Sequence, residues 1–332
     1  MRAIVIREFG PPEVLVPTEP EPQLGPGQVL VEVAFANVTF VETQLRAGTA
    51  PFGRPELPLV PGNGVGGVVA RVGDDLDSGW VGRRVVCSTG GSGGYAQLVA
   101  VDATELIEVP HGLGMADAVA LLADGRTAMA LVEKAEITAG EWVLVEAAAG
   151  GVGTLVTQLC VQAGARVLAA AGGTAKLQVA ADLGAEAAVD YADPGWPTHV
   201  RARTSGVDVV FDGVGGPIAT AAFELLRPGG RMLSYGMASG SFAAIGDDTA
   251  HERQVRLLRG VPVTLHRAIA LSTAALAAAA QGRLTAVIGQ RFPLDRAADA
   301  HAAIESRATI GKTLLEVPPA QTSPSTDPGS GE

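Results

Sequence analysis

The stretch that decides the fold is Glu141-Trp-Val-Leu-Val-Glu-Ala-Ala-Ala-Gly-Gly-Val-Gly-Thr-Leu-Val-Thr-Gln-Leu159. Its apolar residues 142–145 predict a buried parallel strand, and a helical run begins at Thr154 after the glycine turn of residues 150–153. A second strand is expected over residues 165–170, which completes a βαβ unit. A turn without side chains lets a pyrophosphate approach the backbone, and the following helix offers unpaired N–H groups to it. The stretch therefore predicts a dinucleotide site, although such a turn could also serve only to pack the helix on the sheet.

The residues before this stretch follow a different pattern. Up to about residue 115, short apolar runs are separated by proline- and glycine-rich pieces such as residues 10–26 and 49–61. Strands at this spacing, without long helices between them, predict an antiparallel, partly closed β domain. The expected strands cover residues 3–7, 29–34, 65–72, 84–88 and 95–101.

From residue 115 the apolar pattern changes to alternating helices and strands. Two helices are expected over residues 115–123 and 127–134, followed by short apolar strands with helical crossovers. This alternation predicts an α/β domain with a doubly wound, parallel six-stranded sheet. The expected strands cover residues 142–145, 167–170, 187–189, 207–211, 231–235 and 261–265.

Beyond the parallel sheet, the chain is expected to return to the first domain. Helices are predicted over residues 268–281 and 294–306, and a strand over 313–317, so the first domain would be discontinuous. The tail, residues 318–332, is rich in Pro, Ser, Thr and Gly, and we expect it to be disordered. The predicted domains cover residues 1–118, 119–266 and 267–317.

The glycine turn has the spacing Ala147-x-x-Gly150-x-x-Gly153 rather than the common G-x-G-x-x-G. It resembles the cofactor turn of the medium-chain dehydrogenase/reductase superfamily, specifically that of its zinc-free quinone oxidoreductase branch. The resemblance runs from Met1 to about Val317. It implies a GroES-like substrate domain, a Rossmann domain that binds NADPH, and a quinone oxidoreductase-like activity. Four more segments carry it: Met1-Arg-Ala-Ile-Val, Leu57-Pro-Leu-Val-Pro-Gly-Asn-Gly-Val-Gly-Gly-Val68, Gly94-Tyr-Ala-Gln97 and Leu226-Arg-Pro-Gly-Gly-Arg231.

Composition and charge exclude several classes of protein. The chain has 332 residues, 47% of them apolar, which is enough for two domains with separate cores. Its formal net charge of −11 argues against nucleic-acid binding, which needs clustered positive charge. Cys87 and Cys160 lie far apart in apolar contexts and predict no disulfide framework. We find no signal-peptide pattern, and residues 268–280 are too short to span a membrane. A cytoplasmic enzyme with neither membrane nor nucleic-acid partners is expected.

The sequence lacks the zinc ligands of related alcohol dehydrogenases. Those enzymes place a cysteine in the loop after the second strand and a Gly-His-Glu after the proline-rich segment. Here the first loop, residues 36–43, contains no cysteine, and the second reads Gly62-Asn63-Gly64. The five histidines are scattered, and two cysteines cannot form a four-cysteine site. No metal ion is therefore expected, and without a Lewis acid the expected chemistry is reduction of an electrophilic double bond.

The end of the second Rossmann strand bears on the choice of cofactor. NAD-dependent enzymes place an Asp or Glu there, whereas this chain reads Ala170-Ala-Gly-Gly173. Lys176, Tyr191 and Arg307 match residues that the family directs at the 2′-phosphate of NADPH. Alternatively, Lys176 could be a solvated lysine, and Thr127 could cap a helix. The resemblance places these residues at the cofactor: Thr127, Ala149, Gly150, Gly151, Val152, Gly153, Gly172, Gly173, Lys176, Tyr191, Gly213, Val214, Ser234, Tyr235, Gly236 and Arg307.

The sequence leaves open which group donates the proton that accompanies hydride transfer. Relatives often read Asn-Phe-x-Asp in the first-domain loop, where this chain reads Thr39-Phe40-Val41-Glu42. Thr39, in place of the asparagine, and Tyr235, at a strand end, are the candidate catalytic residues. Thr39 can relay a proton but is a poor acid, and Tyr235 could serve packing alone. Glu42 is interpreted as a structural carboxylate, and a proton from solvent would also suffice.

The resulting hypothesis is a zinc-independent enzyme that transfers a hydride from NADPH to a quinone or an α,β-unsaturated carbonyl compound, such as an enone or enoyl substrate. The alternative is a non-catalytic NADPH-binding protein that regulates a partner, and an alcohol dehydrogenase is the third choice. Relatives commonly pair the edge strands of their nucleotide domains. A homodimer that forms through residues 261–265 is therefore expected.

Overall fold

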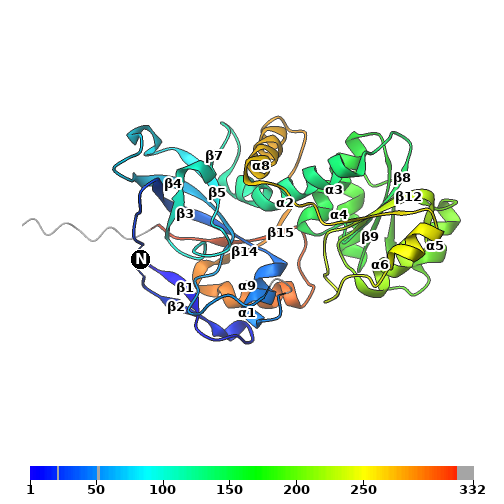
Figure 1. Cartoon of the computed structure of the whole chain (residues 1–332), viewed down its shortest axis with the longest axis horizontal. Coiled ribbons are helices and arrows are strands. Elements are labelled where there is room, and N and C mark those ends of the chain that lie inside the picture. Colours follow the sequence, from blue (N-terminus) through cyan, green and yellow to red (C-terminus); the bar gives the residue numbers. More distant parts are fainter. Residues whose placement is uncertain (21, 51–52, 320–332) are drawn as a thin grey trace, which may run out of the picture.

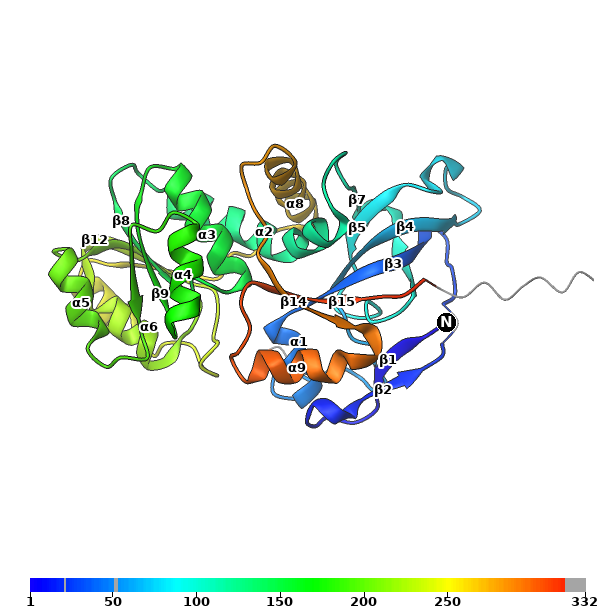
Figure 2. The same ribbon diagram turned by 180° about the vertical axis from the view of Figure 1, so that it is seen from behind.

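The computed structural model describes residues 1–20, 22–50 and 53–319. These residues form two lobes, and the long helix α2 (Met115–Ala135) lies between them (Figure 1). One lobe is built on antiparallel strands and contains both ends of the described chain. The other has a parallel sheet covered by helices, which Figure 2 shows from the opposite side.

A parallel sheet of six strands forms the centre of the second lobe within the described residues. Its strand β8 (Trp142–Glu146) is buried along its whole length. Val143 and Val145 belong to the apolar cluster on one face, and Leu144 to the cluster on the other, because successive residues of a strand point to opposite sides. In spatial order the strands are β10 (Ala187–Asp190), β9 (Arg166–Ala171), β8, β11 (Val207–Asp212), β12 (Leu226–Ser234) and β13 (Arg256–Arg259).

Helices cover both faces of this sheet. Residues of α2 and of α3 (Gly151–Gln162) pack in the cluster on one face, and residues of α5 (Trp196–Arg203) pack in the cluster on the other. The remaining helices are α1 (Phe40–Ala47), α4 (Thr174–Asp182), α6 (Gly216–Phe223), α7 (Asp247–Glu252), α8 (Leu265–Ala280) and α9 (Ala297–Glu305).

The direction of the chain reverses in the middle of the parallel sheet. From β8 it proceeds outward through β9 to β10, and after returning to β11 it proceeds outward on the other side through β12 to β13. The carboxyl ends of β8 and β11 therefore flank a crevice. In open α/β sheets, ligands bind at such a switch point.

The first lobe is an antiparallel sheet, which the C-terminal part of the chain completes. β14 and β15 join it parallel to each other, and β15 pairs with β3 in the antiparallel sense. Valines of β3 alternate into a core that α9 closes. In spatial order the strands are β14 (Ile288–Pro293), β15 (Lys312–Glu316), β3 (Gln28–Val38), β4 (Gly64–Val72), β5 (Arg84–Ser88) and β7 (Leu106–Glu108), with β6 (Leu98–Asp102) on β3 and a separate ribbon of β1 (Ala3–Ile6) and β2 (Leu15–Thr18).

Two sequence-based expectations about single elements are wrong. The helices expected over residues 115–123 and 127–134 are one helix, α2, and the outer strand of the parallel sheet is β13 rather than residues 261–265. The expected strands also omit β2, β7 and β14. Of the tail expected to be disordered, residues 320–332 lie outside the described residues, and Pro318 accepts a hydrogen bond from Gln97.

Candidate functional site

A cleft with a volume of about 690 Å³ lies between the two lobes. One wall is formed by the loops that follow β8, β9, β11 and β12, at the carboxyl ends of the parallel strands. The opposite wall comes from the end of β3, the start of α1 and the segment between α9 and β15. The cleft thus contains the switch point of the parallel sheet.

The glycine turn between β8 and α3 forms the floor of the cleft. A Cβ at Gly150 would meet only the carbonyl oxygen of Ala147, at 3.2 Å, so this side of the turn is open. A Cβ at Gly153 would lie 2.2 Å from the same oxygen, and one at Gly151 would lie 2.0 Å from the carboxylate of Asp124. Gly150 therefore leaves room for a ligand, whereas Gly153 allows the turn itself to close.

Most residues that the sequence assigns to the cofactor line this one cleft. Gly173 and Ser234 do not: Gly173 precedes α4 and donates its N–H to Asp190, and Ser234 ends β12. Those that line the cleft are Thr127, Ala149, Gly150, Gly151, Val152, Gly153, Gly172, Lys176, Tyr191, Gly213, Val214, Tyr235, Gly236 and Arg307.

Thr127 lies within α2 and not at its start. Its hydroxyl donates to the carbonyl oxygen of Ala123, at 2.9 Å, so the helix-cap interpretation of Thr127 is wrong. This bond leaves the lone pairs of the hydroxyl available to the cleft.

Lys176, Tyr191 and Arg307 come together in one corner of the cleft, although they belong to different elements. The Lys176 ammonium donates to the carbonyl oxygen of Arg307, at 2.6 Å. Burial and the Arg307 guanidinium lower the pKa of Lys176, and burial also lowers the pKa of Arg307. The positive charges of Lys176 and Arg307 thus act on one another in this corner, and such a pair of cations favours an anionic ligand.

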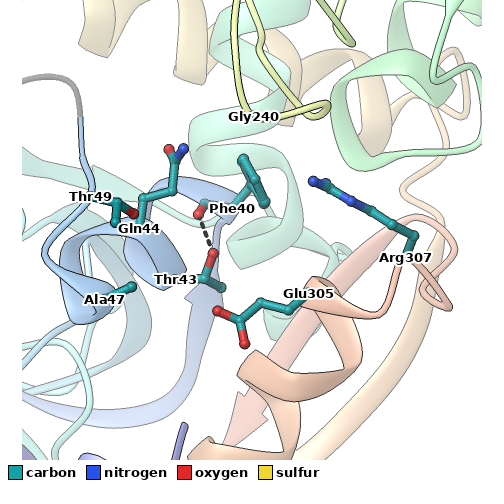
Figure 3. Close-up of a pocket in the computed structure, with 8 residues that line it drawn as sticks. All are labelled: Phe40, Thr43, Gln44, Ala47, Thr49, Gly240, Glu305 and Arg307. Carbon is teal, nitrogen blue, oxygen red and sulfur yellow. Dashed lines mark hydrogen bonds between the residues drawn. The ribbon is translucent and has the colours of Figure 1, made fainter. Parts of the chain in front are cut away.

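Arg307 follows α9 with a left-handed backbone, at φ 59°, where glycine is the usual residue. The Arg307 guanidinium lies 4.5 Å from the centre of the Phe40 ring, and both residues line the cleft. Figure 3 shows the two side chains facing one another. Both line a smaller cavity of about 280 Å³, together with Glu305 and Gln44. Arg307 is thus shared between the main cleft and this side cavity.

Thr39 lines the cleft at the start of α1, and Glu42 lies directly behind it. The Glu42 carboxylate accepts the backbone N–H of Thr39 at 2.6 Å and its hydroxyl at 3.1 Å. The first of these contacts is the reciprocal half of a capping box. Glu42 is 2% exposed, and burial raises its pKa.

Tyr235 lines the cleft at the end of β12, above two buried carboxyl groups. Glu146 ends β8 and Asp212 ends β11, and both are completely buried. Asp212 accepts the N–H groups of Val214 and Gly215 and so shapes the loop after β11. Burial and the neighbouring Asp212 raise the pKa of Glu146 well above its usual range. Burial and both carboxyl groups raise the pKa of Tyr235, so Tyr235 is a weaker acid than an exposed tyrosine.

Sequence reasoning missed a buried ion pair in the cleft. Lys312, the first residue of β15, donates to Asp124 of α2 at 2.9 Å. The Asp124 carboxylate lies against the glycine turn, where it would face an anionic ligand, and Lys312 compensates its charge. The two residues are 188 positions apart in the chain, and no local pattern links them.

Two features are absent from the described residues. In residues 1–20, 22–50 and 53–319, no three His, Cys, Asp or Glu side chains are grouped so that they could hold a metal ion. No helix in the same part of the chain has the length and apolar character needed to cross a membrane.

Comparisons with known proteins agree with this architecture. Residues 25–111 match the family described as "Alcohol dehydrogenase GroES-like domain", and residues 183–315 match "Zinc-binding dehydrogenase". A probable quinone oxidoreductase from Schizosaccharomyces pombe is 36% identical over 94% of this chain and 96% of its own length. A 2-haloacrylate reductase from a Burkholderia species is 30% identical over 95% of this chain and 98% of its own.

Solved structures agree as well. The crystal structure of Escherichia coli quinone oxidoreductase complexed with NADPH superposes with a TM-score of 0.88 at 28% identity, over 95% of this chain and all of that one. The α/β fold predicted from the sequence, a GroES-like domain with a six-stranded parallel Rossmann sheet, is therefore confirmed. The chain belongs to the medium-chain dehydrogenase/reductase superfamily, in its quinone oxidoreductase-like branch.

Proposed function

We propose that this chain is an NADPH-dependent, zinc-independent reductase of quinones or α,β-unsaturated carbonyl compounds. One observation carries the proposal: a single cleft combines an open glycine turn, a cationic corner and an opposite wall from the first lobe. The relatives support the reaction class, since they include quinone oxidoreductases and a 2-haloacrylate reductase. The E. coli structure supports the cofactor, because it holds NADPH.

The residues of the cleft fit NADPH. Gly150 leaves the turn open to a pyrophosphate, and the N-terminus of α3 faces the same space. Lys176, Tyr191 and Arg307 would hold the 2′-phosphate. When bound, the cofactor supplies the hydride, and the wall formed by α1 would hold the acceptor next to it, so that proximity lowers the barrier.

Two side chains could deliver the proton that the reduced acceptor needs. Thr39 and Tyr235 lie on opposite walls of the cleft, and both have a hydroxyl group. Thr39 is the better candidate because its hydroxyl is hydrogen-bonded to the Glu42 carboxyl group, which can resupply the proton that Thr39 relays. We assign Thr39 the donor role and Tyr235 a part in lining the nicotinamide side.

Consumption of NADPH with a panel of quinones and enones tests the proposed function directly. The purified protein should oxidise NADPH with at least one acceptor, and cofactor binding should be followed in parallel by fluorescence. NADPH binding without turnover of any acceptor would instead identify a non-catalytic, regulatory protein. Oxidation of primary or secondary alcohols with NADP⁺ as the only activity would identify an alcohol dehydrogenase.

We also propose a cytoplasmic homodimer that forms through the outer edge of the parallel sheet. β13 pairs with β12 on one side, and no strand of the described residues pairs with its other edge. An exposed strand edge offers unpaired N–H and C=O groups to a second copy of the chain. Light scattering of the parent and of a variant with Leu258→Pro would test this, and a monomeric parent would refute it.

A further inference from the structure

A row of hydrogen-bonded side chains leads from the cleft into the core of the first lobe. Thr39 lines the cleft and donates to Glu42 at 3.1 Å. The hydroxyl of Tyr95 lies 3.4 Å from the same carboxylate oxygen, and 3.0 Å from Nε2 of His301 on α9. Glu42, Tyr95 and His301 are each 2% exposed or less. The capping of α1 by Thr39 and Glu42 would not by itself require the further contacts to Tyr95 and His301.

Glu42 is the centre of the row. One of its oxygens accepts the backbone N–H of Asn63 at 2.8 Å, and the other accepts both groups of Thr39. The charged group that faces it is the Lys312 ammonium, and Tyr95 is its titratable neighbour on the inner side. Burial outweighs these contacts and raises the pKa of Glu42, so a proton rests there more readily than on an exposed glutamate.

Either Thr39 or Glu42 can be the donor in the hydrogen bond between them. The choice of donor decides whether the Thr39 hydroxyl can donate a hydrogen to a ligand in the cleft. An ionised Glu42 can only accept, so the Thr39 hydroxyl points its hydrogen inward and offers only lone pairs to the cleft. A protonated Glu42 can donate its own hydrogen to the Thr39 oxygen. Thr39 is then free to turn its hydrogen toward the cleft and to donate it there.

We propose that Glu42 is a positioning residue that holds the proton which Thr39 delivers to the reduced acceptor. This inference rests on the proposed reductase function. As the acceptor gains its hydride and negative charge, the Thr39 O–H bond breaks and its proton moves to the acceptor oxygen. At the same time the Glu42 O–H bond breaks and its proton moves to the Thr39 oxygen. Glu42 is left as a carboxylate.

The proton returns to Glu42 from the cleft. His301, at the inner end of the row, cannot supply this proton, because burial lowers its pKa to about 3. Its Nδ1 also has no hydrogen-bond partner among the described residues through which a proton could arrive. Arg46, the cation that faces His301, adds to this effect. Burial also raises the pKa of Tyr95 well above its usual range, so Tyr95 stays protonated and orients Glu42. Water that enters after product release reprotonates Glu42 through Thr39.

The protonation of Glu42 can be measured without cofactor or substrate. In protein labelled with carbon-13 at glutamate carboxyl groups, the Glu42 signal should titrate with a midpoint above the ordinary value of 4.5. Glu42→Asp, which removes the labelled signal but keeps a carboxyl group, assigns it. A midpoint at or below the ordinary value would refute a proton held on Glu42.

Kinetics of enone reduction test the delivery. Thr39→Val should lower kcat about 100-fold or more, the usual contribution of a positioned acid, and leave the Kd for NADPH unchanged. Thr39→Ser should restore most of the rate. In the parent, kcat should fall as pH rises through the Glu42 midpoint and should show a solvent deuterium isotope effect; Thr39→Val should lose both. Glu42→Asp, which is one methylene shorter, should also lower kcat.

The control is Thr157→Val. Thr157 is a buried threonine of α3 whose hydroxyl has no partner among the described residues, and it does not line the cleft. This variant should keep the parent kcat and pH profile. If Thr39→Val kept them too, the relay would be refuted while the reductase function stood. If the parent bound NADPH but turned over no acceptor, the proposed function and the relay would both be refuted.

Discussion

Lys176 is the residue on which the preference for NADPH over NADH can be tested. Its ammonium lies in the cationic corner of the cleft and donates to the backbone of Arg307. At the 2′-phosphate it would make a charge-assisted hydrogen bond, which contributes about 1.5–3 kcal/mol. Lys176→Ala should therefore raise the Kd for NADPH roughly 10- to 100-fold and leave the Kd for NADH nearly unchanged.

Fluorescence titration with both cofactors measures this difference. Lys134→Ala is a matched control, because Lys134 also donates to a backbone carbonyl, that of Gly260, but does not line the cleft. Equal losses for the two cofactors in Lys176→Ala, or a parent protein that prefers NADH, would contradict the assignment of Lys176 to the 2′-phosphate.

His301 makes the stability of the protein depend on pH. Its folded pKa of about 3 lies below the ordinary value of 6.5, so at lower pH the unfolded chain binds a proton that the folded chain does not. This contribution to stability is present above about pH 6.5 and is lost as pH falls toward 3. Between pH 6.5 and roughly 4.5, His301 alone should lower the free energy of unfolding by about 2 kcal/mol.

Denaturant unfolding at these two pH values, compared between variants, isolates that contribution. His301→Gln removes the titrating group, so its loss of stability between the two pH values should be smaller than the parent's by this amount. His199→Gln is the control, because the side chain of His199 is 60% exposed. A His301→Gln protein with the parent's pH dependence would show that burial of this histidine has no energetic effect.

Individual residues also show what the sequence could and could not predict. The glycine turn and Lys176 lie near one another in the chain, so a local motif identifies them. Asp124 and Lys312 lie at opposite ends of a long stretch of chain, and only the fold pairs them. Likewise, the contact between Tyr95 and His301 joins the segment before β6 to α9, and no spacing rule connects these two parts of the chain.

At the scale of the element, the turn between β8 and α3 can be tested through two of its glycines. The backbone φ of Gly150 is −82°, which any residue can adopt, and a side chain there would enter open space in the cleft. Gly150→Val should therefore weaken NADPH binding at least tenfold with little change in thermal stability. Gly153→Val should destabilise the fold instead, because its Cβ would collide with the backbone of Ala147.

Thermal denaturation and NADPH titration of both variants distinguish the two roles. The control should not be a glycine with a positive φ, such as Gly140 at 85°, because valine would be strained there. Ala163→Val, at the far end of α3, is a suitable control because it adds two methyl groups at an ordinary φ of −76°. A Gly150→Val protein that bound NADPH as tightly as the parent would remove this turn from the phosphate site.

The two mistaken elements have identifiable physical causes. Gly125 lies in the gap between the two expected helices, but in the structure it is inside α2, where a Cβ would be 2.7 Å from Ala275 of α8. This glycine serves close helix packing rather than a turn. The apolar residues 261–265 suggested a strand, yet they contain Pro262, which cannot donate to a sheet, and Thr264 caps α8. The less apolar β13 forms the edge instead.

For the whole molecule, the division of the chain into two lobes could be predicted from the sequence more reliably than the bounds of single elements. The change from short strands to alternating strands and helices separates the two lobes, because each lobe buries its own apolar surface. The boundary expected at residue 118 lies inside α2, which packs against strands of both lobes. A helix shared by two cores gives no compositional signal at the boundary. The cleft, which needs both lobes in place, could not be described from sequence.

We expect the whole enzyme to work without a metal ion. At the position where zinc enzymes of the superfamily carry a histidine, Asn63 uses its backbone N–H to hold Glu42. A Cβ on the preceding Gly62 would lie 2.5 Å from Gly94, so this loop is packed too closely to admit a larger residue there. In place of a Lewis acid, the fold offers a buried carboxyl group and a hydroxyl. Enone reduction should therefore survive exhaustive chelation, and elemental analysis of the purified protein should find less than one zinc per chain. Stoichiometric zinc, with activity lost on its removal and restored on its return, would overturn the zinc-free assignment and would require ligands other than those at these two loops.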